Sequence, residues 1–272
     1  MSTTISASLV KELRDATGAG MMDCKRALQE TNGDMDAAVV LLREKGMAQA
    51  AKRADRETTE GKVGYRLAED GSKGTMVAVG CETEPVSNND EFLAYAKEVL
   101  EAVDAKGVEA ESELEEERVA LSGKLGENIA VVGAARFEAV DGAKIHAYAH
   151  APHNKFGALV HVRGGDDELG RKVAMHIVAQ RPRWIAREDV PEETIAAERE
   201  IFANSDEVQS KPEAAREKIV DGMLAKRFFA ATPGGALVEQ AWIHDPSKTV
   251  GQALADSGAS VARFARISVT GS

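Results

Sequence analysis

The spacing of the apolar residues changes near residue 61, and this change limits the folds open to the chain more than any other feature. Between residues 5 and 46, apolar residues recur every three to four positions in short segments, which is typical of amphipathic helices. From residue 61 onward, apolar runs are separated by turn residues such as Asp70-Gly71, which is typical of paired strands. We therefore predict a small helical domain followed by a larger part that contains strands and helices.

Three short helices are predicted between residues 5 and 46. Gly18, the Asn32-Gly33 pair and Gly46 mark their ends, and Asp34 is the predicted N-cap of the third helix. The residues predicted to face inward are Leu9, Leu13, Ala16, Met21, Cys24, Leu28, Ala38, Leu41 and Leu42. About 42 residues are close to the smallest size that folds independently, so the helices need this shared core.

Met22 is not explained by this pattern. It follows Met21 directly, and neighbouring side chains on a helix point about 100° apart, so both methionines cannot face the same core. Two interpretations stay open from the residues alone. Met22 either packs against the segment that follows the helices or contacts another molecule.

The composition after residue 46 divides the chain further. Residues 47–60 are polar, rich in alanine and mixed in charge, which indicates a helical linker. Residues 61–189 and 232–272 contain blocks of predicted strands and helices, which favours the α+β class. Residues 190–231 interrupt this order with two helices on either side of 206–211, and we predict a helical hairpin there.

Charge and cysteine content exclude several classes of protein. The formal net charge of −11 argues against a protein that coats nucleic acid, and it permits a protein partner. We interpret Cys24 and Cys81 as free thiols in a reducing cytoplasm. Residues 1–10 lack the basic and apolar parts of a signal peptide, and no apolar run is long enough to span a membrane.

The usual signatures of an active site are weak in this chain. Residues 165–172 resemble a phosphate-binding loop only in glycine spacing, because they lack its Lys-Ser/Thr pair. His146 and His150 would lie about 13 Å apart on one strand, too far to ligate the same metal ion. We interpret these two histidines, with His153 and His161, as surface or edge residues. The sequence predicts no catalytic residue, no metal and no cofactor.

Four short segments place apolar or acidic groups where turns are predicted. They are Met21-Met22, the loop at residues 82–86 after Cys81, Leu125-Gly126, and Ile243-His244 before Asp245-Pro246. Each can be explained as ordinary turn packing, whereas apolar groups that cluster on a surface mark an interface. The residues alone leave both explanations open.

The motifs resemble one known family in sequence and in order. The segments SLVKELRDATGAGMMDCKRAL and GDMDAAVVLLREKG are similar to the N-terminal signature of bacterial elongation factor Ts. The segments EEERVALSGKLGENI, AMHIVAQ with Trp184-Ile185 and EDVP after it, and DPSKTVGQAL also resemble that family. The resemblance covers nearly the whole chain.

This resemblance implies a translation elongation factor of the cytoplasm that is not an enzyme. It would bind the G domain and nucleotide-site region of elongation factor Tu as a guanine nucleotide exchange factor, without contacting nucleic acid or membranes. The implied fold has an N-terminal ubiquitin-associated-like domain, an antiparallel sheet core in two parts with flanking helices, and an inserted hairpin. The expected domains are 1–46, a linker at 47–60, a core N-subdomain at 61–140, a core C-subdomain at 141–189 and 232–272, and the hairpin at 190–231. The hairpin is also the expected surface for a homodimer or a 2:2 complex.

The matching motifs also imply which residues contact the partner. Met22 would be a flexible apolar anchor, and Lys25 would be its polar companion. The other implied contacts are Met21, Leu125, Gly126, His150, Ile243 and His244.

The loop after Cys81 departs from the family pattern. Members usually read Thr-Asp-Phe-Val there, and their Asp-Phe pair is pushed toward the Mg²⁺ and nucleotide of the partner. This chain reads Thr83, Glu84, Pro85 and Val86, so the charge sits on a longer arm and the aromatic ring is lost. We expect Glu84 to disturb the Mg²⁺ ligands and Pro85 to act as a short rigid wedge.

Two other classes of function stay open from the sequence. Because the ring is lost, the chain could be a helper that binds elongation factor Tu with weak or no exchange activity. An enzyme that uses Cys81 and a histidine is the other alternative, and no local motif supports it.

Overall fold

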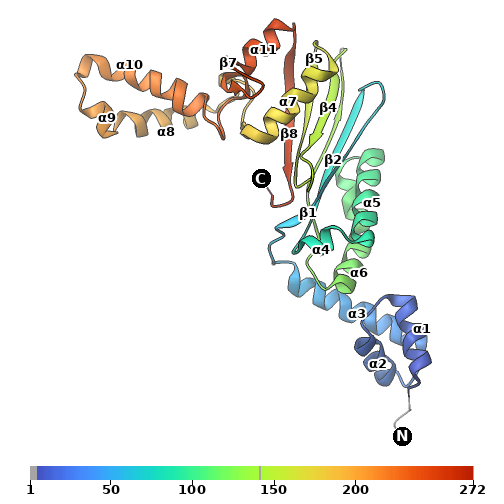
Figure 1. Cartoon of the computed structure of the whole chain (residues 1–272). Coiled ribbons are helices and arrows are strands. Elements are labelled where there is room, and N and C mark those ends of the chain that lie inside the picture. Colours follow the sequence, from blue (N-terminus) through green and yellow to red (C-terminus); the bar gives the residue numbers. More distant parts are fainter. Residues whose placement is uncertain (1–4, 141, 272) are drawn as a thin grey trace. The chain divides into compact units, whose positions relative to one another are not determined.

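The computed structural model describes residues 5–140 and 142–271, which form two compact units (Figure 1). The first unit contains the described residues up to Gly64, together with Val77–Ala134 and the end of the chain from Ser268. The second unit contains Tyr65–Met76 and Ala135–Ile267. Each unit is described below by itself.

Helices dominate the first unit. Its elements are α1 (Ala7–Thr17), α2 (Met21–Glu30), α3 (Met35–Arg53), α4 (Glu84–Ser87), α5 (Asp90–Lys106), the 3-10 helix η1 (Val108–Leu114) and α6 (Glu115–Leu125). Three strands run through the division between the units and form a sheet in the order β1-β2-β3: β1 (Glu60–Leu67), β2 (Lys73–Cys81) and β3 (Ala130–Glu138).

The three N-terminal helices enclose a small aliphatic core, and the third begins at its predicted cap, Asp34. The Ser6 hydroxyl accepts a hydrogen bond from the backbone N–H of Leu9 at 3.2 Å, and the Asp34 carboxylate accepts one from Ala37 at 3.0 Å. The buried residues of this core are Val10, Leu13, Cys24, Ala27, Leu28 and Ala38. Of the predicted inward face, Leu13, Cys24, Leu28 and Ala38 are buried, Leu9, Leu41 and Leu42 are only partly buried, and Ala16 is exposed.

The prediction that Met21 faces this core is wrong. Met21 is 56% exposed, because α2 begins at this residue and its first turn extends beyond the core. The buried stripe of α2 starts one turn later, at Cys24, and continues with Ala27 and Leu28. Met21 and Met22 therefore both lie at the surface.

The prediction that the third helix ends at Gly46 is also wrong. Helix α3 continues through Gly46 to Arg53, so the first part of the predicted linker is helical and continuous with the domain before it. Helix α3 packs against α6, and a Cβ atom added at Gly123 of α6 would lie 3.4 Å from the Gly46 Cα atom. The close contact between the two helices is therefore made at Gly123 of α6, and Gly46 lies within α3 instead of ending it.

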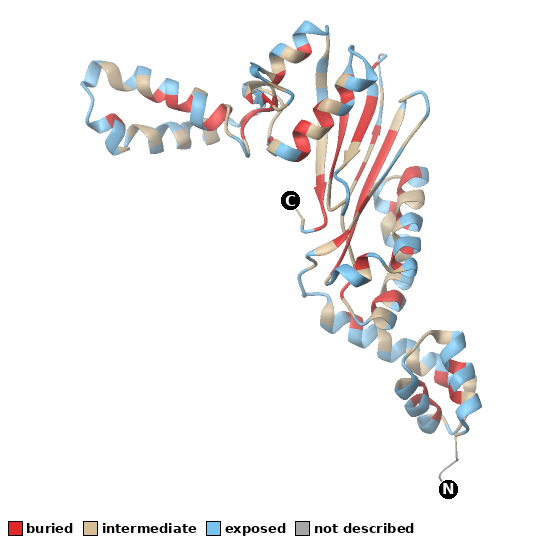
Figure 2. Ribbon diagram, viewed as in Figure 1, coloured by how far each residue is buried: buried red, intermediate tan, exposed pale blue. Residues whose placement is uncertain are grey.

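A second core in the first unit joins β2 to α5 and α6. Asn89 caps α5, because its side chain accepts hydrogen bonds from the N–H groups of Glu91 and Phe92. The buried residues are Val77, Val79, Cys81, Phe92, Tyr95, Val99, Val103, Leu121 and Ile129. Strand β2 is buried on both faces from Gly74 to Cys81, and it is seen as a continuous red segment in Figure 2.

The second unit is built on a sheet with the order β4-β5-β8. Its elements are β4 (Lys144–Ala149), β5 (Phe156–Arg163), α7 (Asp167–Gln180), η2 (Arg187–Asp189), α8 (Glu192–Ala203), α9 (Asp206–Gln209), α10 (Glu213–Met223), the π-helical turn η3 (Leu224–Phe229), η4 (Leu237–Glu239), β6 (Ala241–Trp242), β7 (Asp245–Thr249), α11 (Val250–Asp256) and β8 (Ser260–Ser268). Strands β4 and β5 are antiparallel, with Lys144 opposite Val162 and Ala149 opposite Gly157. Helix α7 packs on β4 and β5, and Asp166 caps it.

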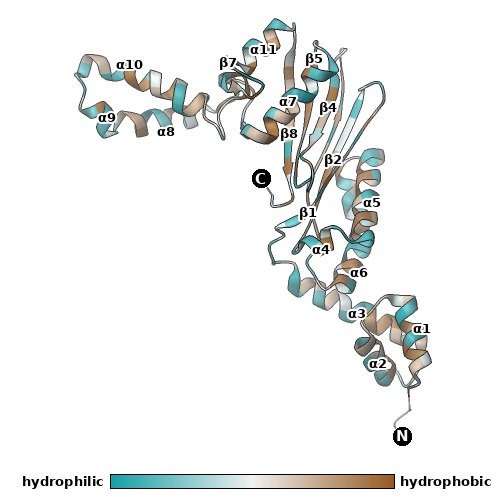
Figure 3. Ribbon diagram, viewed as in Figure 1, coloured by the Kyte–Doolittle hydropathy of each residue, from teal (hydrophilic) through white to brown (hydrophobic). Residues whose placement is uncertain are grey.

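The predicted helical hairpin is present as α8, α9 and α10. Chain entry and exit are joined by a parallel bridge between Trp184 and Ala236. Val220, Leu224 and Phe228 recur every four positions and are buried, and the Phe228 ring centroid lies 5.7 Å from that of Trp184. Figure 3 shows hydrophobic residues of α10 and α8 between hydrophilic ones; α10 buries Val220 and Met223, whereas α8 contributes only partly buried residues to this core.

Helices and small sheets occur in separate blocks, so the α+β prediction is confirmed. The short hairpin of β6 and β7, with Trp242 opposite Asp245, was not predicted, because two residues are too few to show an alternating pattern. Within the described residues, no helix combines the length and apolar character that a membrane crossing requires.

Candidate functional site

The start of α2 presents two apolar side chains and a cation to the outside. Met22 is 63% exposed, and Lys25, one turn later, is also exposed. Asp23 pairs with Arg26, so it does not neutralise Lys25, and Lys25 makes no ion pair within the described part of the chain. Because a packed helix start has no need of two exposed methionines, this turn has the chemistry of a protein-docking surface.

The predicted loop after Cys81 forms a single helical turn, α4. Its N-cap is Thr83, and Pro85 occupies a position in the first turn where its missing N–H costs nothing. Glu84 and Pro85 are exposed, whereas Ser87 at the end of the turn is buried. The turn therefore projects one acidic and one rigid apolar side chain from a fixed base.

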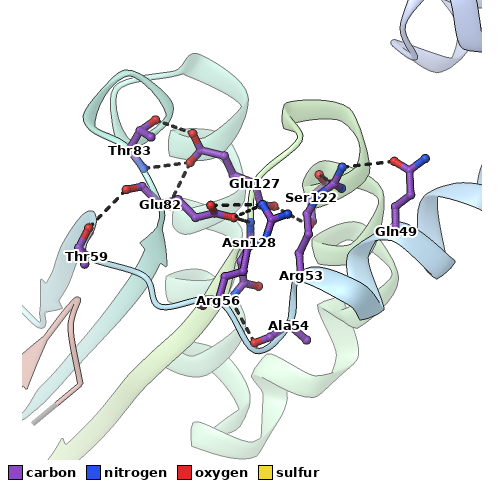
Figure 4. Close-up of polar contacts among 10 residues, drawn as sticks. All are labelled: Gln49, Arg53, Ala54, Arg56, Thr59, Glu82, Thr83, Ser122, Glu127 and Asn128. Carbon is purple, nitrogen blue, oxygen red and sulfur yellow. Dashed lines mark hydrogen bonds and ion pairs between the residues drawn. The ribbon is translucent and has the colours of Figure 1, made fainter.

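Thr83 does not cap α4 with its own side chain, because Glu127 engages it from outside the helix (Figure 4). The Glu127 carboxylate accepts hydrogen bonds from the backbone N–H groups of Glu82 and Thr83, each at 3.0 Å. It also accepts one from the Thr83 hydroxyl. Hydrogen bonds to an ionised acceptor are the stronger kind, so this carboxylate fixes the start of α4.

Glu82 makes the reverse connection. Its carboxylate accepts a hydrogen bond from the backbone N–H of Asn128 at 2.7 Å and forms an ion pair with Arg56 at 3.3 Å. The Asn128 side chain is 4% exposed and donates to the carbonyl oxygens of Ala54 at 3.3 Å and Arg56 at 2.8 Å. The base of the turn is thereby connected to the chain that leaves α3.

The predicted contact at Leu125-Gly126 lies directly before this acid. Gly126 ends α6 with φ 78°, a left-handed conformation that glycine adopts without strain. Gly126 is exposed, and Leu125 is half-buried against the core of α5 and β2. The structure therefore brings this turn next to the Thr83–Val86 turn in the same unit.

Ile243 and His244 form the turn between β6 and β7 in the second unit. Ile243 is half-buried, and His244 is exposed with its ring 4.7 Å from Trp242. The His244 Nε2–H group donates to the carbonyl oxygen of Lys172 at 3.2 Å. The turn thus rests on α7.

A buried pair, His176 and Gln240, supports this turn from inside. The Ile243 N–H group can only donate, so it fixes His176 Nδ1 as the acceptor at 3.4 Å. His176 Nε2–H then donates to Gln240 Oε1 at 3.0 Å, and Gln240 Nε2 donates to the carbonyl oxygens of Ala231 and Gly234. Burial lowers the pKa of His176 to about 4, so the ring is neutral at physiological pH.

His150 lies beyond the end of β4 in the second unit. It is exposed, and its Nδ1 atom lies 3.0 Å from the Tyr148 hydroxyl. Met21, Met22, Lys25, Leu125, Gly126 and Thr83–Val86 belong to the first unit, whereas His150, Ile243 and His244 belong to the second.

Comparison with known proteins gives the family. A family model described as Elongation factor TS matches residues 82–271, which is more than half of the chain. The Elongation factor Ts of Thioalkalivibrio sulfidiphilus (strain HL-EbGR7) is 43% identical over 276 residues, covering 98% of this chain and 92% of that protein. This chain belongs to the elongation factor Ts family.

Other relatives show the same extent of similarity. Elongation factor Ts of Methylococcus capsulatus (strain ATCC 33009 / NCIMB 11132 / Bath) is 40% identical over 277 residues, with 98% of this chain and 92% of that protein covered. Elongation factor Ts of Halorhodospira halophila (strain DSM 244 / SL1) is 41% identical over 277 residues with the same coverage. Membership of the elongation factor Ts family makes the chain a translation elongation factor.

The features that suggested other chemistry have structural explanations. The Cys81 thiol is buried and donates to the carbonyl oxygen of Thr83 at 3.4 Å, and burial with the nearby Glu127 charge raises its pKa to about 12. A thiol that stays protonated is a poor nucleophile. No group of three His, Cys, Asp or Glu side chains suited to a metal occurs within residues 5–140 and 142–271.

The interpretation of the histidines as surface or edge residues is only half right. His150 and His153 are exposed, but His146 is 8% exposed and His161 is 5% exposed. Both lie inside strands that are covered by other elements, and a Cβ atom at Gly170 of α7 would lie 2.3 Å from the His146 ring. Burial lowers the pKa of each ring.

A cavity of about 770 Å³ lies between α2, α3 and α6 of the first unit. Several of its charged residues are paired with one another, as Lys45 with Glu30 at 2.7 Å and Arg43 with Glu116. A ligand would therefore have to displace ion pairs, and we assign none to this cavity.

Three residues of the site were missed by sequence reasoning. Glu127, His176 and Gln240 support the predicted contact turns without being exposed on them. A usable signal existed for two of them: Glu127 follows a predicted helix-ending glycine, and His176 lies between apolar residues of a predicted helix. Only a folded chain shows that each reaches a distant backbone group.

Proposed function

We propose that this chain is a guanine nucleotide exchange factor for elongation factor Tu, and that the turn at Thr83–Val86 weakens the partner's hold on Mg²⁺ and GDP. One observation carries the proposal. In a chain of this family, the turn that departs from the usual pattern still projects an exposed acid, Glu84, and an exposed Pro85 from a base held by charge-assisted hydrogen bonds.

The physical requirement is differential binding. An exchange factor forms no covalent bond, so it must bind the empty partner more tightly than the loaded one, and it then weakens nucleotide binding by the same factor. Moving a partner from about 99% loaded to about 99% empty requires roughly 5.5 kcal/mol of such preference. Only contacts incompatible with bound Mg²⁺ and phosphate supply it, and a carboxylate next to the Mg²⁺ ligands is such a contact.

We assign docking to the other exposed turns. Met22 is the proposed apolar anchor on the partner's G domain, with Met21 and Lys25 beside it. Leu125, Gly126, His150, Ile243 and His244 complete the proposed contact residues. Helices α1 to α3, with their common small core, are the proposed ubiquitin-associated-like domain.

Release of fluorescent GDP from purified elongation factor Tu tests the proposal. The wild-type chain is expected to accelerate release, whereas a Glu84→Ala/Pro85→Ala double variant is expected to bind the partner and release GDP slowly. Glu98→Ala, an exposed acid on α5, is the matched control and should behave as the wild type. An unchanged rate in the double variant would remove the turn from the mechanism.

Docking is tested separately with Met22→Ala. Because Met22 is exposed, its loss should leave folding intact and weaken binding to nucleotide-free elongation factor Tu by about tenfold. Met47→Ala, an equally exposed methionine at 53%, is the control. Equal binding by the two variants, measured by calorimetry, would rule out Met22 as the anchor.

The absence of an aromatic ring at Pro85 supports a second candidate, a helper that binds elongation factor Tu without exchange. Proline fixes its backbone but fills less space than phenylalanine, so it intrudes less far. Tight binding to the partner with no acceleration of GDP release would favour this helper. Association of two chains through the hairpin at 190–231, alone or in a 2:2 complex, is a further part of the proposal, and light scattering measures it.

A further inference from the structure

Two carboxylates at the base of α4 hold each other's neighbouring backbone. Glu127 accepts from the N–H groups of Glu82 and Thr83, while Glu82 accepts from the N–H group of Asn128 (Figure 4). Each carboxylate therefore binds the backbone next to the other one, and the segments 82–83 and 127–128 are fixed relative to one another. We call this set of contacts the carboxylate clamp.

We infer that Glu127 is a positioning residue for the turn at Thr83–Val86, which we call the exchange turn. It acts through the carboxylate clamp on Thr83 and Glu84. The inference rests on the proposed exchange function. Glu127 would not touch the partner's nucleotide or Mg²⁺. It would fix the place from which Glu84 and Pro85 are presented.

The first argument is that α4 lacks a means of holding itself. It has 4 residues, and a single helical turn is unstable in isolation because nucleation fixes several residues for one hydrogen bond. The Thr83 side chain makes no capping hydrogen bond, since its hydroxyl donates to Glu127 instead. The start of α4 thus depends on an acid 44 residues away in the sequence.

The second argument is that one carboxylate serves three donors that no other described group serves in its place. Two are backbone N–H groups, that of Glu82 partly buried and that of Thr83 exposed, at 3.0 Å each, and the third is the Thr83 hydroxyl. An ionised acceptor can satisfy all three at once, whereas water would leave the turn free to move. If the turn at Thr83–Val86 moved aside when the partner binds, it would contribute little differential binding. Its base therefore has to be fixed before binding.

The third argument is that the clamp extends to the end of α3. Asn128 donates from its side chain to the carbonyl oxygens of Ala54 and Arg56, and Arg56 pairs with Glu82. Helix α3, which belongs to the same small domain as Met21 and Met22, is therefore followed directly by residues that contact the carboxylate clamp.

The experiment compares Glu127→Ala, Glu127→Gln and the control Glu98→Ala in stimulated GDP release over a range of chain concentrations. Glu127→Ala is expected to lower the maximal rate by about tenfold or more while the half-saturating concentration changes by less than about twofold. Glu127→Gln should recover much of the rate, because one amide oxygen can still accept from both backbone N–H groups. A role in folding alone would not separate the maximal rate from the half-saturating concentration.

Hydrogen exchange of the free chain provides the second measurement. In Glu127→Ala, the amides of Glu82 and Thr83 should exchange about tenfold faster than in the wild type, while amides of the α5 core stay protected. If Glu127→Ala proves unfolded by circular dichroism, Glu127→Gln and Thr83→Val replace it, and Thr83→Val should show a smaller increase.

The outcomes separate the two proposals. A wild-type chain that fails to accelerate GDP release contradicts the exchange function, while the hydrogen-exchange pattern still reports whether the clamp holds the turn. An active wild type with an equally active Glu127→Ala overturns the positioning role. Unchanged amide exchange at Glu82 and Thr83 in that variant also overturns it.

Discussion

Two exposed turns of this molecule, at Thr83–Val86 and at Ile243-His244, are held in opposite ways. The first rests on ionised carboxylates at the surface, where Glu82 and Arg56 side chains are 24% and 53% exposed. The second rests on His176 and Gln240, which are neutral and 0% exposed. One exposed turn is thus held by charged side chains near the solvent, and the other is held by neutral hydrogen bonds in the protein interior.

The difference predicts which turn is coupled to folding. A hydrogen bond at the surface can be replaced by water, so losing it moves a loop more than it destabilises a domain. A buried polar group left without a partner retains its full desolvation cost. We expect damage to the His176–Gln240 pair to unfold the second unit before it alters docking, and damage to the carboxylate clamp to lower the rate of GDP release before it alters folding or docking.

The largest effect is expected for Gln240→Leu. This change leaves the His176 Nε2–H group and the carbonyl oxygens of Ala231 and Gly234 without their partner, at a cost of about 3 kcal/mol. Urea unfolding followed by tryptophan fluorescence measures it, because Trp184 and Trp242 both lie in the second unit. Glu200→Ala on α8 is the exposed control. A loss below about 1 kcal/mol would contradict the contrast between the two turns.

Acid should act mainly on the buried pair. The folded pKa of His176, about 4, lies below the unfolded value of 6.5, so protonation favours the unfolded state. Its contribution to stability is complete above pH 6.5 and is lost as the pH falls toward 4. Between pH 7 and pH 5 the loss should be about 2 kcal/mol, and His176→Gln should lack this part of the slope. An identical slope in the variant would contradict the assignment.

Asn128→Ala should produce a smaller and local effect. It removes the donor to the carbonyl oxygens of Ala54 and Arg56, which costs about 1 kcal/mol, and it keeps the backbone N–H that Glu82 accepts. Trypsin should then cleave faster after Arg56. Asn204→Ala, at the exposed end of α8, is the control. Unchanged cleavage would show that the clamp does not reach the end of α3.

The smallest effect is expected for Arg56→Ala. Its ion pair with Glu82 is exposed and screened by salt, so its loss should change stability by less than about 0.5 kcal/mol. Stimulated GDP release should fall less than in Glu127→Ala, because Glu127 keeps all its contacts to Glu82 and Thr83. A destabilisation above about 1.5 kcal/mol would contradict the expectation that this exposed ion pair contributes little to stability.

Local patterns were sufficient to predict most elements. Asp34, Asn89 and Asp166 cap helices because a short polar side chain next to an apolar period satisfies the first N–H groups, whatever the rest of the chain does. The stripe of Val220, Leu224 and Phe228 is buried for the same reason, since its period alone requires a covering helix. The exposed positions of Met22, Glu84 and Pro85 are consistent with the expected contact sites.

Distant contacts were beyond the reach of such patterns. Gly46 is a helix stop by composition, but it lies where α6 approaches, so tertiary packing overrides the local preference. Met21 fits the apolar period, but the core ends one turn away. Glu127 and Thr83 are 44 residues apart, and no spacing rule connects a helix-ending acid to another helix's first turn.

The passage of α3 through Gly46 has a mechanical consequence. A helix resists bending and twisting far more than an extended strand of the same length, and here it is also braced where Gly46 faces Gly123. A force applied at Met21 and Met22 would therefore be transmitted along α3 to its C-terminal end, whereas a flexible linker would not transmit it. Deleting or inserting one residue in α3 would rotate α1 and α2 by about 100° about the helix axis, although the side chains at both ends of α3 stay the same.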